Sequence, residues 1–248
     1  MTAADLWDDP EKDYRTRYQL PTQFIWREED WARIDFDSYM SMVRSMLPSP
    51  PATILDVGCG PGMGAARLID SGFEVHGIDY SERAIGFAHT LVPLGRFVVG
   101  DIRRLGDVAG LEEHYDAAIC VEVLEHVPPE FRSDVLRGIA GRLLPGGRVV
   151  LSTPTDRMHT NRWDYPRATE QQLRDALVAA GFEIERVAYQ HAMSMLMDPR
   201  FWRLISNRYV DLVGLRRVIR RLVLRRPASV GAESDAGRLI VVAARSAT

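Results

Sequence analysis

The chain has 248 residues, of which 46% are hydrophobic and 26% charged, and its formal net charge is −3. This length and composition fit one α/β domain with an added cap, and the slightly acidic balance argues against a general polyanion-binding protein. No apolar run is long enough to span a bilayer, and the acidic N-terminus has no apolar signal segment. The two cysteines, Cys59 and Cys120, lack metal-site spacing and are interpreted as reduced thiols, which predicts a cytoplasmic protein.

A helix is expected from about Glu28 to Leu47, with apolar residues on one face, and prolines at 48, 50 and 51 end it. Strands and helices then alternate along the chain. Strands are expected at 54–57, 73–79, 96–101, 115–120, 148–153, 182–187 and 239–243, and helices at 65–71, 82–90, 131–144 and 170–180.

This alternation predicts an α/β fold with a doubly wound, mostly parallel sheet of seven strands. Residues 1–50 are expected to form a helical lid and 51–190 the core, while 191–237 form a cap insertion before a final core strand in 238–248. Right-handed crossovers place the carboxyl ends of parallel strands along one edge, where ligands bind. Four acids fall at or just past such ends, namely Asp56, Asp79, Asp101 and Glu122.

The first predicted strand ends in Asp56-Val57-Gly58-Cys59-Gly60-Pro61-Gly62. Glycines allow positive φ in a tight turn and let backbone amides approach a ligand closely. The spacing differs from the dinucleotide pattern G-x-G-x-x-G because the third glycine comes one place early. A carboxylate at this strand end suits a cationic ligand better than a diphosphate. At this point the chain resembles the class I S-adenosylmethionine (SAM) methyltransferases, whose cofactor carries a sulfonium and an ammonium group.

The resemblance covers roughly residues 50–190 and implies a SAM site. Asp79 lies at the interval from the first glycine at which an acid meets a ribose. Asp101 and Ile102 resemble the family's adenine clamp, with Tyr80 available for the other face of the ring. The alternative is that each acid is a helix cap or a loop carboxylate. The expected cofactor-binding residues are Asp56, Gly58, Gly60, Gly62, Asp79, Tyr80, Asp101, Ile102 and Val121. In this family the seventh strand runs antiparallel beside the sixth.

A second motif, Glu122-Val123-Leu124-Glu125-His126, follows the fourth predicted strand. On a helical turn Glu122, Glu125 and His126 share one face, and two carboxylates with an imidazole suit Mg²⁺ or Mn²⁺. Such an ion lowers the pKa of a bound substrate hydroxyl. The motif resembles the O-methyltransferases of ubiquinone biosynthesis and the small-RNA 2′-O-methyltransferases, in which it is associated with a metal.

Metal binding and proton abstraction exclude one another at His126, because a metal-bound nitrogen takes no proton. Without a metal, Glu125 caps a helix and His126 packs or serves as the general base. His159, in the loop after the fifth strand, is a fourth ligand or a separate base. The candidate catalytic residues are therefore His126, Glu125 and His159.

Within the insertion, residues 213–226 alternate arginine pairs with apolar pairs, which predicts a basic amphipathic helix. The candidate partners of such a helix are an anionic membrane surface, an RNA backbone or an acidic substrate. The favoured interpretation is instead a cap helix whose apolar stripe seals the pocket or a homodimer interface.

These features together predict a SAM-dependent O-methyltransferase acting on a hydroxyl of a small molecule such as a sugar, a quinol or a polyketide. The alternatives are RNA 2′-O-methylation, which the overall charge opposes, N- or C-methylation of a small molecule, and a non-catalytic SAM-binding scaffold at a membrane.

Overall fold

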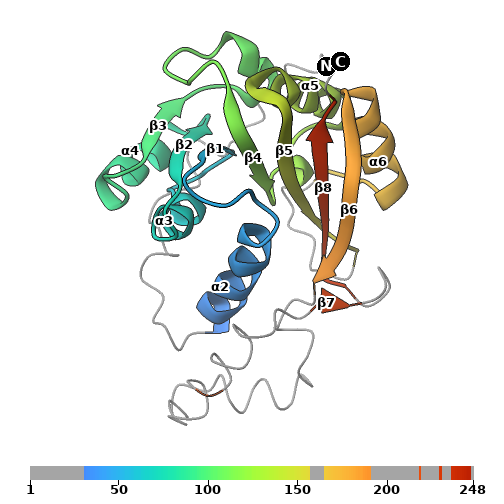
Figure 1. The fold of residues 1–248 in the computed structure, drawn as a ribbon, viewed down its shortest axis with the longest axis horizontal. Helices are drawn as coiled ribbons and strands as arrows, with labels where there is room; N and C mark the ends of the chain where they lie inside the picture. Colours follow the sequence, from blue (N-terminus) through green and yellow to red (C-terminus); the bar gives the residue numbers. More distant parts are fainter. Residues whose placement is uncertain (1–30, 157–164, 191–217, 219–228, 231–235, 247–248) are drawn as a thin grey trace.

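The computed structural model describes residues 31–156, 165–190, 218, 229–230 and 236–246, and Figure 1 shows their arrangement. Their strands form one sheet in the order β3-β2-β1-β4-β5-β8-β6-β7. The strands are β1 (Thr53–Val57), β2 (Glu74–Asp79), β3 (Arg96–Val99), β4 (Tyr115–Val121), β5 (Leu143–Pro154), β6 (Phe182–Gln190), β7 (Ser229–Val230) and β8 (Arg238–Arg245). All seven expected strands are therefore present, and β7 is an additional pair of residues at the edge.

Strands β3, β2, β1, β4 and β5 pair in parallel, whereas β8 enters between β5 and β6 and is antiparallel to both. The antiparallel last strand that the family resemblance implied is thus confirmed. The order reverses at β1, since β2 and β4 lie on its two sides. Ligands of wound sheets bind at such a switch point, outside the carboxyl ends of the strands.

Helices cover both faces of the sheet, as the alternating pattern predicted (Figure 1). The α-helices are α2 (Trp31–Arg44), α3 (Met63–Ile69), α4 (Glu82–Leu91), α5 (Arg132–Arg142) and α6 (Glu170–Ala179), and the 3-10 helices are η3 (Ile102–Asp107), η4 (Leu124–His126) and η5 (Pro129–Phe131). Buried residues of α2, α3 and α4 join one hydrophobic cluster, and those of η3, η4, α5 and α6 join the other. Because side chains alternate along a strand, Ile54 faces the first cluster and Leu55 the second.

Helix α2, expected to belong to a lid, packs into the core. Tyr39 and Met42 of the helix, and Met46 just after its end, belong to the same buried cluster as Ile54 of β1 and Ile240 of β8, which bears out the predicted apolar face. The helix also reaches the carboxyl edge of the sheet, where Phe36 and Met40 line a cavity. It therefore contributes both to stability and to the site.

The helix starts follow the side-chain caps expected from the sequence. Ser81 Oγ accepts from the amide of Ala84 at the start of α4, and Thr169 forms a capping box with Gln172 at the start of α6. Within the described residues, no helix has the length and apolarity needed to cross a membrane. The predicted base His159, the first 30 residues and all of the predicted basic helix except Val218 lie outside the described residues.

Candidate functional site

The glycine turn after β1 is built as the sequence predicts. Gly58, Gly60 and Gly62 have φ of 75°, 52° and 84°, all in the left-handed region that glycine adopts without strain. A Cβ on Gly58 would lie 2.6 Å from Val123 Cγ2, so the loop that follows β4 packs directly against the backbone of Gly58. The amides of Gly58 and Cys59 both donate to the carbonyl of Ile78, at 2.8 and 3.0 Å, and fix the turn to β2.

Asp79, the predicted ribose ligand, also holds the glycine turn in place. Its Oδ2 accepts from the amide of Gly60 at 2.9 Å, and its Oδ1 accepts from the amide of Ser81 at 2.9 Å. The side chain is only 7% exposed, and burial raises the pKa of its carboxyl, while these amides oppose the rise. Asp79, the last residue of β2, therefore fixes the loops around it through its carboxylate, and its contact with a ribose stays a prediction.

Asp56, at the end of β1, faces a cavity of about 170 Å³ that the glycine turn borders. The side chain is 4% exposed, and its Oδ2 has no hydrogen-bond partner within the described part of the chain. Burial raises the pKa of the Asp56 carboxyl to about 7, and the negative charge of Asp79 adds to the rise. A buried carboxylate without a counter-charge is costly, so the site is complementary to a cationic ligand.

The cavity borders both the glycine turn and Glu122. Of the predicted cofactor residues, Val121 lines it, together with Gly58, Gly60 and Asp56. The only charged side chains among its described lining residues are Asp56 and Glu122, and the other lining residues are glycines or have apolar side chains. The lining residues are Phe36, Met40, Asp56, Gly58, Cys59, Gly60, Pro61, Met63, Gly64, Ile119, Val121 and Glu122.

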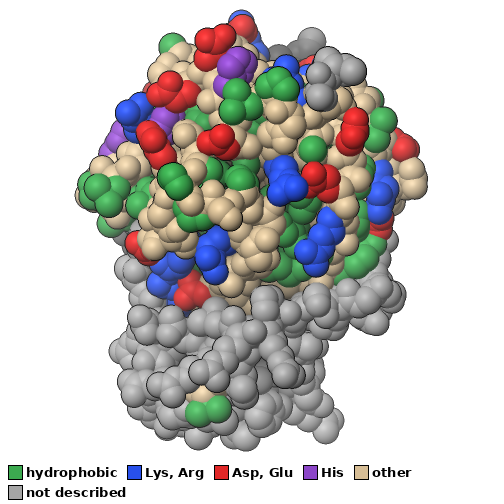
Figure 2. Space-filling view, viewed as in Figure 1, with side chains coloured by type: hydrophobic (Ala, Val, Ile, Leu, Met, Phe, Trp, Pro, Cys, Tyr) green, Lys and Arg blue, Asp and Glu red, His purple; other side chains and the backbone are tan. Residues whose placement is uncertain are grey.

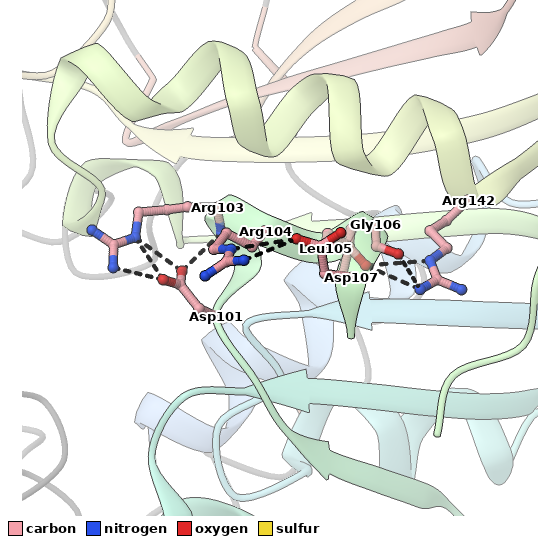
Figure 3. A network of polar contacts seen from close by, with 7 residues as sticks. All are labelled: Asp101, Arg103, Arg104, Leu105, Gly106, Asp107 and Arg142. Atoms are coloured by element: carbon pink, nitrogen blue, oxygen red, sulfur yellow. Dashed lines mark hydrogen bonds and ion pairs between the residues drawn. The ribbon is translucent and has the colours of Figure 1, made fainter. Parts of the chain in front are cut away.

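Asp101, expected to accept a hydrogen bond from the amine of an adenine, forms an ion pair with the nearby Arg103. Its carboxylate accepts from the amide of Arg103 at 2.9 Å and forms a two-pronged ion pair with the Arg103 guanidinium, with Nη2 at 2.6 Å (Figure 3). Arg103 also lies 5.0 Å over the ring of Phe131. Ile102 is buried in the core cluster beside it, and Tyr80 is half-buried after β2. An adenine would therefore share Asp101 with Arg103.

The prediction that Glu122, Glu125 and His126 share one helical face is wrong. Only Leu124–His126 form a 3-10 turn, while Glu122 lies before it with φ of 54° and Val123 is non-helical. Glu125 is buried, and His126 is half-buried at the end of η4. Within the described ranges, no three His, Cys, Asp or Glu side chains gather as a metal site would require. This triplet therefore does not fit Mg²⁺ or Mn²⁺.

Glu122 turns instead toward β5 and β8. Ser152 Oγ donates to its Oε1 at 3.0 Å, and Arg238 Nε lies 3.5 Å from its Oε2. Arg238 in turn contacts Asp35, Gln190 and the Tyr39 ring. Burial raises the pKa of the Glu122 carboxyl, with Arg238 and Ser152 acting against the rise. Burial acts to lower the pKa of the Arg238 guanidinium, but Glu122 and Asp35 outweigh it and keep the group protonated.

These polar contacts escaped the sequence analysis because their partners come from distant segments. Arg238 stands 203 residues from Asp35 along the chain, and Tyr39 stands 113 from Ser152. The available signal was a charged residue at the very start of an otherwise apolar strand, Arg238-Leu239-Ile240-Val241-Val242. Both cysteines are buried free thiols, as predicted, and burial raises the pKa of each.

A switch-point cavity between a glycine turn and a buried acid defines a Rossmann-like nucleotide-binding domain. A family described as a methyltransferase domain matches residues 31–187, which is more than half of the chain. The chain therefore belongs to the class I SAM-dependent methyltransferases.

Curated relatives include the ubiquinone biosynthesis O-methyltransferases of Dechloromonas aromatica, 34% identical over 155 residues, and of Leptothrix cholodnii, 30% identical over 154 residues. Each match covers 60% of this chain, and the chain spans 58% of the length of each relative.

Solved structures confirm the fold. A magnesium protoporphyrin IX methyltransferase from Synechocystis with bound SAM is 22% identical, with a TM-score of 0.57 over 98% of this chain and 94% of its own. A SAM-dependent methyltransferase from Archaeoglobus fulgidus is 16% identical, with a TM-score of 0.61 over 94% of this chain and all of its own. A [4+2]-cyclase is equally similar, at 22% identity and a TM-score of 0.60 over 86% of this chain and 82% of its own. The fold by itself therefore does not fix the reaction.

Proposed function

We propose that this chain binds SAM at the glycine turn and transfers its methyl group to a hydroxyl of a small molecule. The observation that carries the proposal is the buried, uncompensated Asp56 in a cavity that also contains Glu122. A cationic methyl donor supplies the charge that Asp56 lacks, and Glu122 lines the same cavity. Asp56 belongs to β1, and Glu122 directly follows the neighbouring strand β4.

The cofactor supplies the reactive methyl group, and the protein orients it and excludes water. A lone pair of the acceptor oxygen forms the new bond to carbon, the electron pair of the broken bond stays on sulfur to give S-adenosylhomocysteine, and the hydroxyl proton passes to solvent water. The apolar wall made by Phe36, Met40 and Ile119 keeps water from the reacting atoms. His126 is not among the described lining residues, so its role as a base stays a prediction.

The acceptor class rests on the relatives named as O-methyltransferases of ubiquinone biosynthesis, which favour a phenol or quinol. RNA is a weaker candidate. On the face shown in Figure 2, acidic and basic side chains of the described residues are interspersed, whereas an RNA surface concentrates arginine and lysine. A divalent metal forms no part of this proposal, because the residues expected to hold it do not come together.

The test has two stages. Calorimetric titration with SAM, and separately with S-adenosylhomocysteine, first measures binding. Release of S-adenosylhomocysteine is then followed with catechols, quinols, sugars and short RNA as acceptors. We expect micromolar SAM affinity and turnover of at least one phenolic hydroxyl compound. Absence of SAM binding contradicts the cofactor site, and turnover of RNA alone contradicts the small-molecule acceptor.

A further inference from the structure

The cavity is lined by two charged side chains. Asp56 lies beside the glycine turn, which we call the donor side, and Glu122 is the second. Glu122 directly follows β4. Since Asp56 is the charged group on the donor side, Glu122 is the charged side chain that an acceptor meets. This inference rests on the proposed function and deepens it.

Glu122 lines the cavity, and its backbone is held in a strained conformation. Within the described ranges it is the only residue other than glycine with positive φ, at 54°. Its amide donates to the carbonyl and the Oγ of Ser152, both at 3.2 Å. Strained residues that the surrounding structure over-determines are concentrated at functional sites.

A chain of hydroxyl groups leads to this carboxylate from helix α2. Ser152 Oγ gives its hydrogen to Glu122 Oε1, so in its contact with Tyr39 it accepts, and the Tyr39 hydroxyl donates. Burial raises the pKa of the Tyr39 hydroxyl well above its usual value, which keeps that proton in place. One oxygen of Glu122 is thereby fixed by the protein.

Arg238 holds the other oxygen without saturating it. Its guanidinium is anchored by Asp35 Oδ2 at 3.0 Å and Gln190 Oε1 at 3.0 Å, and it lies 4.8 Å over the Tyr39 ring. Its Nε is 3.5 Å from Glu122 Oε2 and has no hydrogen-bond partner within the described residues. The charge attracts Oε2 while the distance leaves lone pairs for an incoming hydroxyl.

We propose that Glu122 receives the acceptor's hydroxyl in the donor cavity and that Arg238 is its positioning residue. The hydroxyl donates a hydrogen bond to Glu122, which turns an oxygen lone pair toward the methyl group. Arg238, only 12% exposed, supplies the fixed positive charge at this edge that a divalent ion would otherwise bring. Arg238, Glu122, Asp35, Tyr39, Ser152 and Gln190 are called the acceptor network below.

The experiment compares Glu122→Gln, Arg238→Lys and Arg238→Ala in the full chain. Arg148→Ala is the matched control, because Arg148 also pairs with a glutamate, Glu185, but at the surface of β5. With catechol as acceptor, we expect Glu122→Gln and Arg238→Ala to raise KM at least tenfold. Arg238→Lys should retain more activity than Arg238→Ala, methylguanidinium should partly rescue Arg238→Ala, and the SAM affinity of each should stay within twofold of wild type.

A double-mutant cycle of unfolding between Glu122→Gln and Arg238→Ala tests the pair without any cofactor. Three results would each overturn the inference. They are additive effects of the two substitutions on the free energy of unfolding, a wild-type KM in Glu122→Gln, and an equal response of Arg148→Ala to methylguanidinium. Should Arg238→Ala fail to fold, Glu122→Gln and Arg238→Lys carry the test. Loss of SAM binding in the wild-type protein would instead contradict the proposed function, and absence of any hydroxyl turnover would overturn both.

Discussion

The two ends of the cavity are built in opposite ways. The donor end, formed by the Gly58–Gly62 turn with Asp56 and Asp79, comes from two consecutive βα units and is fixed by backbone amides. The acceptor network draws one or two side chains from each of four separate elements, α2, β5, β6 and β8, and Glu122 from the loop after β4. Local sequence thus specifies cofactor binding, whereas the tertiary fold specifies the acceptor. A change at one end should leave the other intact, and the four experiments below test how the donor end is built.

The largest effect is expected from Gly58→Ala. The new Cβ would meet Val123 at 2.6 Å and place a side chain at φ 75°, so SAM affinity should fall at least ~100-fold and stability by roughly 2–4 kcal/mol. Gly146→Ala is the matched control, because Gly146 has the same φ of 75° with nothing within 4 Å. Titration calorimetry and chemical denaturation compare the two, and equal losses of SAM affinity would refute the local explanation.

Asp56→Asn should weaken SAM binding about 10- to 100-fold, the contribution of one or two charge-assisted contacts. The same change should stabilise the free protein. In the folded protein the pKa of Asp56 is about 7, above the value of ~4 in the unfolded chain. The free energy of unfolding of the wild-type protein therefore falls as pH rises from the lower value to the higher one.

Thermal denaturation should therefore show Asp56→Asn melting ~2–8 °C higher at pH 8, with little difference at pH 4. Asp70→Asn, at an exposed carboxylate, is the control and should change neither affinity nor melting. A variant that loses SAM affinity and is also less stable at pH 8 would disprove the uncompensated charge.

SAM affinity should increase with pH in the wild-type protein. Because the cationic donor favours the ionised form of Asp56, whose free pKa is about 7, affinity should rise roughly 5- to 10-fold between pH 6 and 7.5. Calorimetry across this range measures the change. Asp56→Asn is the control, since its SAM affinity should not change with pH. A wild-type affinity that does not change with pH would assign the Asp56 carboxyl a lower pKa.

The smallest effect is expected at the adenine side. Arg103→Gln removes the guanidinium from Asp101 and leaves that carboxylate to an adenine amine, so SAM should bind about 2- to 3-fold more tightly. Arg104→Gln, which removes an exposed pair with Asp107, is the control. Inosine and adenosine as competitors show whether the exocyclic amine is the group concerned. Weaker SAM binding in Arg103→Gln would mean that Arg103 itself contacts the cofactor.

The sequence predicted most of the fold because its signals are local. Buried strands, the glycine turn and the caps at Ser81 and Thr169 each depend on a few neighbouring residues. It predicted Asp56 and Val121 at the cavity for the same reason. The prediction that Glu122, Glu125 and His126 share a helical face failed because a helical spacing was assumed where β4 is followed by a left-handed residue. Arg238 could not be assigned, since its role exists only when β8 lies beside β5 and β6.

The position of β8 also constrains how the protein is made. Strands β5 and β6 each hydrogen-bond to β8 and not to one another, so the sheet has a slot until residues 238–245 have been synthesised. Two unsatisfied strand edges border that slot, and such edges recruit other chains during folding. Because Arg238 is the first residue of the strand that fills it, closing the slot and neutralising Glu122 and Asp35 are a single event. A nascent chain stalled before this point would carry two open strand edges and would lack the guanidinium that pairs with Glu122.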